Sequence, residues 1–234
     1  QYRNPMVVRV AGYGYQKGFG GHFHNDNSVA AIRDIPGVVI ASPARPDDAA
    51  AMLHTCAAAA KEAGVVCVFL EPIALYHTRN LHDAGDGAWL AAYPDFSDPS
   101  AHVPIGAART HGEGTDLTMI TFGNGLPMSL RAVRSLHALG VSAQVLDLRW
   151  LAPLPRADVL AAARATGRVL VVDETRRSGG VSEAVVTALV DDGFDGPIAR
   201  VASEDSFIPL GDAAHHVLLD QRAIIDAAVA LVRR

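Results

Sequence analysis

The stretch VVIASPARPDDAAAMLHTCAAAAKEAGVVCVFLEP, residues 38–72, decides the fold. Two short runs of β-branched and apolar residues, 38–41 and 65–70, flank an Ala-rich segment that contains neither Gly nor Pro in its interior. Pro46 suits the first turn of a helix, the acidic pair behind it suits the positive helix N-terminus, and Gly64 suits the helix end. The pattern therefore predicts strand, helix and strand, which is the repeating unit of a parallel sheet.

The same alternation continues along the chain, so the predicted fold class is α/β. Further strands are expected at 6–10, 117–121, 143–148, 168–172 and 198–201, and further helices at 27–34, 126–139, 156–165, 180–190 and 220–232. Residues 77–104 lose this periodicity and are rich in Gly, Asp, Pro and Ser, which is typical of a linker. We therefore expect two domains, residues 1–76 and 105–234, joined by this linker.

Bulk composition restricts the function. The chain has 234 residues, 50% of them hydrophobic, which is enough for a substantial core. A formal net charge of −5, with no segment that concentrates Lys or Arg, argues against electrostatic binding to nucleic acid or to an anionic membrane. No apolar stretch is long enough to span a bilayer. Cys56 and Cys67 are expected to be small buried hydrophobes, as in a reducing cytoplasm. Because the chain lacks an initiator Met and enters a strand almost at once, we expect a piece of a longer polypeptide.

The segment GYGYQKGFGGHFHNDN, residues 12–27, follows the first strand and holds most of the candidate chemistry. Its glycines approach the dinucleotide-binding fingerprint. However, no helix can begin among them and the next strand ends without an acidic residue, which disfavours a Rossmann-type nucleotide site.

His22 and His24 precede the expected helix, for which Asp26 or Asn27 would be the N-cap. The positive helix N-terminus favours neutral imidazoles that are suited to proton transfer. A surface loop with hydrogen-bonded histidines is the alternative. A zinc site lacks its third and fourth ligands, so no metal ligands are assigned.

Six segments carry a family resemblance, and they follow one another along nearly the whole chain. They are residues 24–43, Asp47-Asp-Ala49, Phe69-Leu-Glu-Pro72 with Leu75-Tyr76, Asp147-Leu-Arg-Trp-Leu-Ala-Pro-Leu154, Glu174 with Ser178-Gly-Gly180, and Asp205-Ser-Phe-Ile-Pro209. Together they resemble the beta subunit of the decarboxylating component of branched-chain 2-oxo acid and pyruvate dehydrogenases, a transketolase-like family. The resemblance implies that residues 1–76 are the later part of a thiamine diphosphate-binding pyrimidine-type domain. It also implies that residues 105–234 form a transketolase C-terminal-like three-layer α/β/α domain.

The resemblance further implies oxidative decarboxylation of a 2-oxo acid on thiamine diphosphate, followed by acyl transfer to a lipoyl domain. It gives the catalytic role to His24, near the thiazolium, and places His22 and Phe23 in the wall of the same pocket. Asn25 and Asp26 stand where the family usually has Ser and Gln. Asp26 is expected either to orient the imidazole and raise its pKa or only to cap the helix. The second α/β block, residues 105–234, is expected to contain no convergent set of acid, base and nucleophile.

Thiamine diphosphate and magnesium are the cofactors that the resemblance implies for the complete enzyme. The family's activating glutamate lies upstream of the histidine, whereas here no Glu precedes Glu62. Gly85-Asp86-Gly87 matches part of the diphosphate motif, but the next Asn is Asn124, so we interpret the tripeptide as a turn. The main cofactor-binding residues are therefore expected outside this chain. The implied partners are an alpha-type subunit or a missing upstream domain, a lipoyl-bearing acyltransferase and further copies of the chain.

Two other functions stay open. A transketolase or deoxyxylulose-phosphate synthase would share the cofactor, but a sugar-phosphate substrate would require a basic cluster beside His24, where the sequence offers only Lys17. Alternatively, the chain is a non-catalytic assembly module, because it lacks the glutamate and the diphosphate motif. We expect the isolated chain neither to bind thiamine diphosphate tightly nor to turn over.

Overall fold

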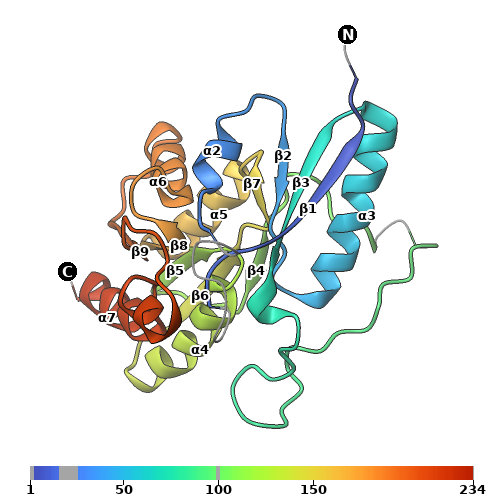
Figure 1. Ribbon diagram of the computed structural model, residues 1–234. Coiled ribbons are helices and arrows are strands. Elements are labelled where there is room, and N and C mark those ends of the chain that lie inside the picture. The colour runs from blue at the N-terminus through green and yellow to red at the C-terminus, as the bar shows by residue number, and fades with distance from the viewer. Residues whose placement is uncertain (1–2, 16–25, 99–100, 234) are drawn as a thin grey trace.

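The computed structural model describes residues 3–15, 26–98 and 101–233, which form an α/β fold as predicted (Figure 1). In chain order the elements are β1 (Met6–Gly12), α2 (Val29–Arg33), β2 (Val39–Ala41), α3 (Pro46–Ala63), β3 (Val66–Pro72), η1 (Ile73–Leu75), β4 (Arg109–His111), β5 (Leu117–Thr121), α4 (Gly125–Ala138), β6 (Ala143–Asp147), β7 (Trp150–Ala152), α5 (Arg156–Thr166), β8 (Val169–Arg176), α6 (Val181–Asp191), β9 (Ile198–Ser203), η3 (Gly211–His216) and α7 (Gln221–Val232).

The first sheet has the strand order β1-β3-β2-β7. Its first three strands are parallel, and β7 pairs with β2 in the antiparallel direction. Helix α3 covers one face of this sheet (Figure 1), where Met52 and Cys56 pack against Phe69. The helix begins at Pro46 and ends at Gly64, which adopts the left-handed conformation and donates its N–H to the carbonyl of residue 60. The strand–helix–strand unit predicted for residues 38–72 is therefore confirmed.

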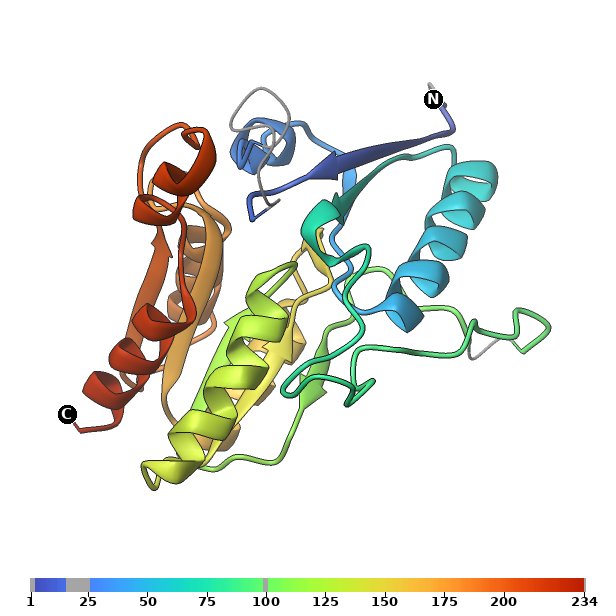
Figure 2. The ribbon, with the colours of Figure 1, turned by 60° about the horizontal axis from the view of Figure 1, so that its bottom comes forward.

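The second sheet has the order β4-β6-β5-β8-β9, with β4 antiparallel and the other strands parallel. Helices α4 and α7 cover one face and α5 and α6 the other, as Figures 1 and 2 show. Leu126 and Ile224 belong to the core on the first face, and Val159 and Val185 to the core on the second. This is the three-layer α/β/α architecture that the family resemblance implied for residues 105–234.

We call the first sheet with helix α3 the first block, and the second sheet with helices α4, α5, α6 and α7 the second block. Strand β7 joins the two blocks, because it follows β6 of the second sheet and pairs with β2 of the first. The side chain of Trp150 in β7 is fully buried. One hydrophobic cluster also contains Ile40 and Leu70 of the first sheet together with Ile120 and Leu146 of the second. The sequence did not predict β4 and β7, since three-residue antiparallel strands leave no periodic pattern. The domain boundaries at residues 76 and 105 stay a prediction.

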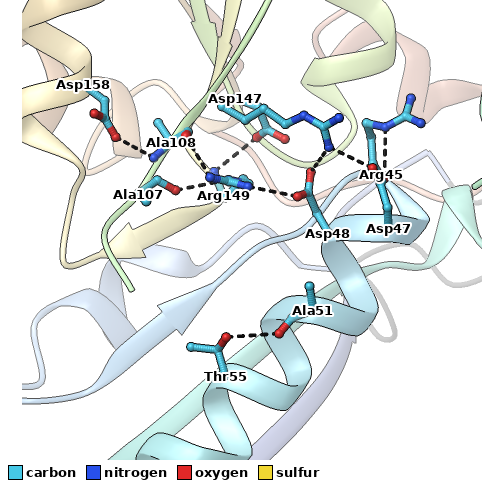
Figure 3. Close-up of polar contacts among 11 residues, drawn as sticks. Arg45, Asp47, Asp48, Ala51, Thr55, Ala107, Ala108, Asp147, Arg149 and Asp158 are labelled. Atoms are coloured by element: carbon cyan, nitrogen blue, oxygen red, sulfur yellow. Dashed lines mark hydrogen bonds and ion pairs between the residues drawn. The ribbon is translucent and has the colours of Figure 1, made fainter. Parts of the chain in front are cut away.

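A buried ionic network reinforces the junction (Figure 3). Arg149, in the turn after β6, donates to the Asp48 carboxylate at 3.0 Å and to the carbonyls of Ala107 and Ala108 at 3.1 and 2.8 Å. Arg109 of β4 donates to Asp47 at 2.9 Å and to Asp48 at 3.1 Å. Because both aspartates lie in the first turn of α3, the network ties that helix to the second sheet.

The predicted linker closes on itself around Asp86. The Asp86 carboxylate accepts backbone N–H groups from four residues, Leu81, His82, Asp83 and Ala88, which confirms that the Gly-Asp-Gly tripeptide is a turn. The linker also inserts Trp89, which is 1% exposed, into the hydrophobic cluster that contains α4 and α7. Across the described residues, no helix has both the length and the apolar character needed to cross a membrane.

Candidate functional site

The predicted catalytic residue His24 and its predicted pocket neighbours His22, Phe23 and Asn25 lie outside the described residues. Their roles therefore stay predictions. The structure describes Asp26 and the chain on both sides of the predicted pocket segment, at residues 13–15 and 26–28. The way in which these two flanks are held defines the candidate site.

The entry flank contains the buried Tyr13 and the half-buried Tyr15 on either side of Gly14. The Tyr13 and Ser42 hydroxyls are hydrogen-bonded at 2.8 Å, and the Tyr15 hydroxyl donates to the carbonyl of Leu219 at 3.0 Å. Both tyrosines adopt positive φ angles, 65° and 72°, which are uncommon for bulky residues. A Cβ at Gly14 would lie 2.8 Å from the Leu218 side chain. The entry flank is therefore held in an unusual conformation by contacts to both blocks of the fold.

The exit flank is held by Arg176 of β8. Its guanidinium lies 2.5 Å from the Asp26 carboxylate, which also accepts the backbone N–H of Asn27 at 2.9 Å and the hydroxyl of Ser28. Helix α2 begins at Val29 with Ser28 as its N-cap and without a side-chain cap. The prediction that Asp26 or Asn27 caps this helix is therefore wrong, because both side chains turn toward the second block.

The contacts of Asp26 decide its charge. Partial burial, the largest single influence, raises the pKa of this carboxyl, but the hydrogen bonds from Ser28 and Asn27 and the charge of Arg176 together lower it below its usual range. Asp26 is therefore a carboxylate at neutral pH, and its charge is balanced by Arg176. This balance limits the electrostatic effect that Asp26 can exert on a neighbouring imidazole.

Beneath the two flanks lies the switch point of the second sheet. The connection from β5 runs to β6 on one side and the connection from β8 runs to β9 on the other, which opens a crevice between the ends of β5 and β8. Glu174 of β8 fills this crevice and is fully buried. Its carboxylate oxygens accept the backbone N–H of Asn124 at 2.6 Å and the Asn124 amide at 2.7 Å. A Cβ at Gly123, where φ is +52°, would lie 2.1 Å from Oε1 of Glu174.

Other acids surround this crevice at the C-terminal ends of β6 and β8. Burial raises the pKa of Glu174 to about 8, although the two hydrogen bonds from Asn124 oppose the shift. Burial and the charge of Asp48 raise the pKa of Asp147 to about 8, and its Oδ2 has no hydrogen-bond partner among the described residues. Burial, followed by the charges of Glu174, Asp173 and Asp147, holds the pKa of Tyr13 well above its usual value. The expectation that the second block contains no convergent set of acid, base and nucleophile stays a prediction.

The main-chain carbonyl of Glu174 connects the crevice to both flanks. It accepts the side-chain amide of Asn27 at 2.8 Å and the hydroxyl of Ser203 at 3.0 Å. The Ser203 oxygen accepts the backbone N–H of Leu219 at 3.0 Å, and the carbonyl of Leu219 accepts the hydroxyl of Tyr15. We call Tyr15, Asn27, Glu174, Ser203 and Leu219 the carbonyl clamp. Sequence reasoning missed it, because Asn27 and Glu174 are 147 residues apart and only the family motif marked Glu174.

Two cavities lie near the first sheet. One of about 110 Å³ borders both flanks, at Tyr13 and Asp26, and its other lining residues include Val10, Leu70 and Ile32, so it suits a small apolar group. A larger one of about 640 Å³ lies between α3, the end of β3 and the linker, and none of its lining residues belongs to either flank. Within the described ranges, no group of three or more His, Cys, Asp or Glu could hold a metal ion.

Comparisons with known proteins give the family context. Residues 106–224 match the family described as "Transketolase, C-terminal domain". The chain is 29% identical over 236 residues to "Pyruvate dehydrogenase E1 component subunit beta" of Bacillus subtilis, which covers 97% of this chain and 65% of the relative. It is 30% identical to "Pyruvate dehydrogenase E1 component subunit beta-1, mitochondrial" of Arabidopsis thaliana, over 94% of this chain and 57% of the relative. The chain thus spans less than two thirds of the length of these relatives.

Solved structures agree at the level of the fold. The structure titled "Split gene transketolase, inactive beta4 tetramer" superimposes with a TM-score of 0.69 and 24% identity, over 97% of this chain and 65% of that one. A 2-oxoglutarate:ferredoxin oxidoreductase from Magnetococcus marinus gives a TM-score of 0.59 at 11% identity, over 97% of this chain and 49% of that one. At these identities the likeness shows a shared fold.

Proposed function

We propose that this chain, which belongs to the family of transketolase C-terminal domains, is the beta-type part of a thiamine diphosphate-dependent 2-oxo acid dehydrogenase. The relatives that it resembles over most of its length are beta subunits of the E1 component of pyruvate dehydrogenase. The complete enzyme would oxidatively decarboxylate a 2-oxo acid and transfer the acyl group to a lipoyl domain. The observation that supports this most is the extent of the likeness. Identity of 29–30% to subunits named for pyruvate dehydrogenase extends over 94–97% of the chain, across both blocks of the fold.

In this proposal His24 acts as a general acid-base group that accepts and donates a proton during acyl transfer. This role would raise the rate by a factor of about 10²–10⁴. His22, Phe23, Asn25 and Asp26 would complete the pocket around it. Support comes from the two flanks, which are fixed by hydrogen bonds and by the ion pair between Asp26 and Arg176. A catalytic group gains from such support because its position relative to the substrate must be reproducible.

When bound, thiamine diphosphate would supply the ylid and the electron sink for decarboxylation. Gly85-Asp86-Gly87 does not fit the diphosphate and magnesium site, since the Asp86 oxygens are already engaged by backbone N–H groups. We therefore assign the main cofactor-binding residues to an alpha-type subunit or an upstream domain. The other proposed partners are a lipoyl-bearing acyltransferase and further copies of the chain, in the cytoplasm.

The test is dye-linked oxidation of a panel of 2-oxo acids by the complete enzyme with thiamine diphosphate and magnesium, with lipoamide acylation as a second readout. We expect turnover of one class of acid and a loss of acylation of about 10²-fold or more in His24→Ala. His216→Ala is the matched control, because this exposed histidine in η3 lies outside the site, and its activity should equal that of the wild type.

Three outcomes would contradict parts of the proposal. Ketol transfer between sugar phosphates without 2-oxo acid oxidation would establish the transketolase or deoxyxylulose-phosphate synthase alternative. A complete enzyme that assembles through this chain but needs no residue of the predicted pocket would show a non-catalytic assembly module. Micromolar binding of thiamine diphosphate by the isolated 234 residues, measured by calorimetry, would show that the cofactor-binding residues are not elsewhere.

A further inference from the structure

The carbonyl clamp holds both flanks of the predicted pocket segment at one point of β8. Asn27 donates directly to the carbonyl of Glu174, and Tyr15 reaches the same carbonyl through Leu219 and Ser203. Asn27 and Ser203 are 4% and 3% exposed, so water competes little for these hydrogen bonds. Breaking them would leave buried polar groups unpaired, which makes the bonds costly to lose.

Glu174 is itself a rigid support for this arrangement. Both of its carboxylate oxygens accept hydrogen bonds from Asn124 at the start of helix α4, and its backbone belongs to β8, which lies between β5 and β9 in the second sheet. A site built on a strand and supported by a second layer of hydrogen bonds is held more precisely than one carried by a free loop. The positions of the two flanks are therefore set by the second block, although both flanks belong to the first.

We propose that Asn27 and Ser203 are positioning residues, which act by fixing the two ends of the segment that carries His24. This inference rests on the proposed function, since His24 is the group whose position matters. Neither residue would contact the substrate. Their effect on the reaction would pass through the hydrogen bonds to the carbonyl of Glu174, at 2.8 and 3.0 Å.

The first measurement needs no catalytic activity. Lys17 is the only Lys or Arg in the sequence between the two flanks, so the rate of tryptic cleavage at Lys17 is the readout for opening of the flanks. Asn27→Leu removes the donor to Glu174, and Ser203→Val removes a hydroxyl that Ser203→Thr keeps. We expect cleavage to be about three- to tenfold faster in Asn27→Leu and Ser203→Val, as for the loss of one buried hydrogen bond, and close to wild type in Ser203→Thr.

Thr118→Val is the matched control. Thr118 also forms a buried side-chain hydrogen bond, to the carbonyl of Ala162 at 2.8 Å, but near the N-terminal end of β5, where it pairs with the first residue of β8 and not with the C-terminal part that contains Glu174. The Thr118→Val substitution should leave the rate of tryptic cleavage at Lys17 unchanged. An equal acceleration in Thr118→Val, or no acceleration in Asn27→Leu and Ser203→Val, would overturn the proposal. Comparison of the two Ser203 variants keeps the test decisive even if Asn27→Leu fails to fold.

The second measurement uses lipoamide acylation by the complete enzyme. We expect kcat to fall about three- to tenfold in Asn27→Leu and Ser203→Val while KM for the 2-oxo acid stays constant, and Ser203→Thr to restore kcat. Faster cleavage at Lys17 with an unchanged kcat would overturn the positioning role. A wild-type enzyme inactive on every 2-oxo acid would instead refute the proposed function, and the cleavage rates would still report the clamp.

Discussion

The guanidinium of Arg149 lies 3.0 Å from the carboxylate of Asp48, and both residues are less than 10% exposed. Arg149 also has a positive φ of 59°, which turns its side chain back toward α3 and the carbonyls of Ala107 and Ala108. The tight turn after β6 and the first turn of α3 are thereby held by one side chain. This contact explains how the two sheets keep a fixed arrangement, although only β7 passes between them in the strand order.

Arg149→Met should lower the free energy of unfolding by about 1.5–3 kcal/mol, because it removes one of the two guanidinium partners of the buried Asp48 carboxylate and the donor to two half-buried carbonyls. Urea denaturation followed by far-UV circular dichroism measures the change. Arg156→Met is the control, since Arg156 pairs with Asp192 at the protein surface and its removal should change little. If the two variants lost equal stability, Arg149 would not be a structural link between the blocks.

Gly123→Ala should destabilise the fold more than Gly140→Ala, although both glycines have positive φ angles, +52° and +77°. A Cβ at Gly140 meets nothing within 4 Å, so the substitution costs only the backbone strain of about 1–2 kcal/mol. A Cβ at Gly123 would lie 2.1 Å from Glu174 Oε1 and would displace a buried hydrogen bond worth about 0.5–1.5 kcal/mol in addition. Thermal unfolding of the two variants measures the difference. Equal losses would show that Glu174 yields freely and does not fill the crevice rigidly.

The sequence predicted the elements whose information is local. Helix α3 is an example, because Pro46, the acidic first turn and Gly64 each mark its ends without reference to any other part of the chain. Strands β4 and β7 were missed because their three residues form strands only through antiparallel partners in β6 and β2. Their existence depends on tertiary pairing, which leaves no repeat in the sequence.

The same distinction between local sequence information and tertiary pairing applies to the candidate site. A strand followed by the Gly-rich stretch and the histidines is visible locally, and the family resemblance gave it a role. The arrangement that holds it depends on Glu174 and Ser203, whose partners lie on distant strands, and on an Asp26 that contacts Arg176 rather than the helix behind it. The spacing of Asp26 suited a helix cap, but an arginine 150 residues away provided a stronger charged partner.

Asp26 and Arg176 should be energetically coupled. Their side chains are 31% and 23% exposed, so solvent screens the pair and we expect a coupling energy of about 1 kcal/mol rather than the value of a fully buried pair. A double-mutant cycle with Asp26→Asn, Arg176→Met and the combined variant measures this energy by urea denaturation. Arg222→Met with Asp226→Asn is a comparison cycle on an exposed pair in α7, for which the coupling should be smaller. Additive effects at Asp26 and Arg176 would contradict the anchoring of the exit flank.

Asp147→Asn should change how stability depends on pH. Burial and the charge of Asp48 raise the pKa of Asp147 from 3.8 to about 8 in the native state. The native protein therefore retains a proton that the unfolded chain loses above about pH 4. The stabilisation from this proton is complete below pH 4 and is lost as the pH rises to about 8, with a slope of about 1.4 kcal/mol per pH unit. The variant cannot bind this proton, so its free energy of unfolding should fall less steeply than that of the wild type over this range.

Urea denaturation at half-unit intervals from pH 4 to 9 measures the two slopes. Asp26→Asn is the control of opposite sign, because the pKa of Asp26 is lowered in the native state and its stabilising effect is lost only as the pH falls below about 4. Above pH 5 the free energy of unfolding of Asp26→Asn should therefore change with pH as that of the wild type does. That of Asp147→Asn should diverge from the wild type over the same range. Parallel curves for all three proteins would mean that Asp147 is ionised in the native state. Its unpartnered Oδ2 would then require a cation or hydrogen-bond donor that none of the described residues provides.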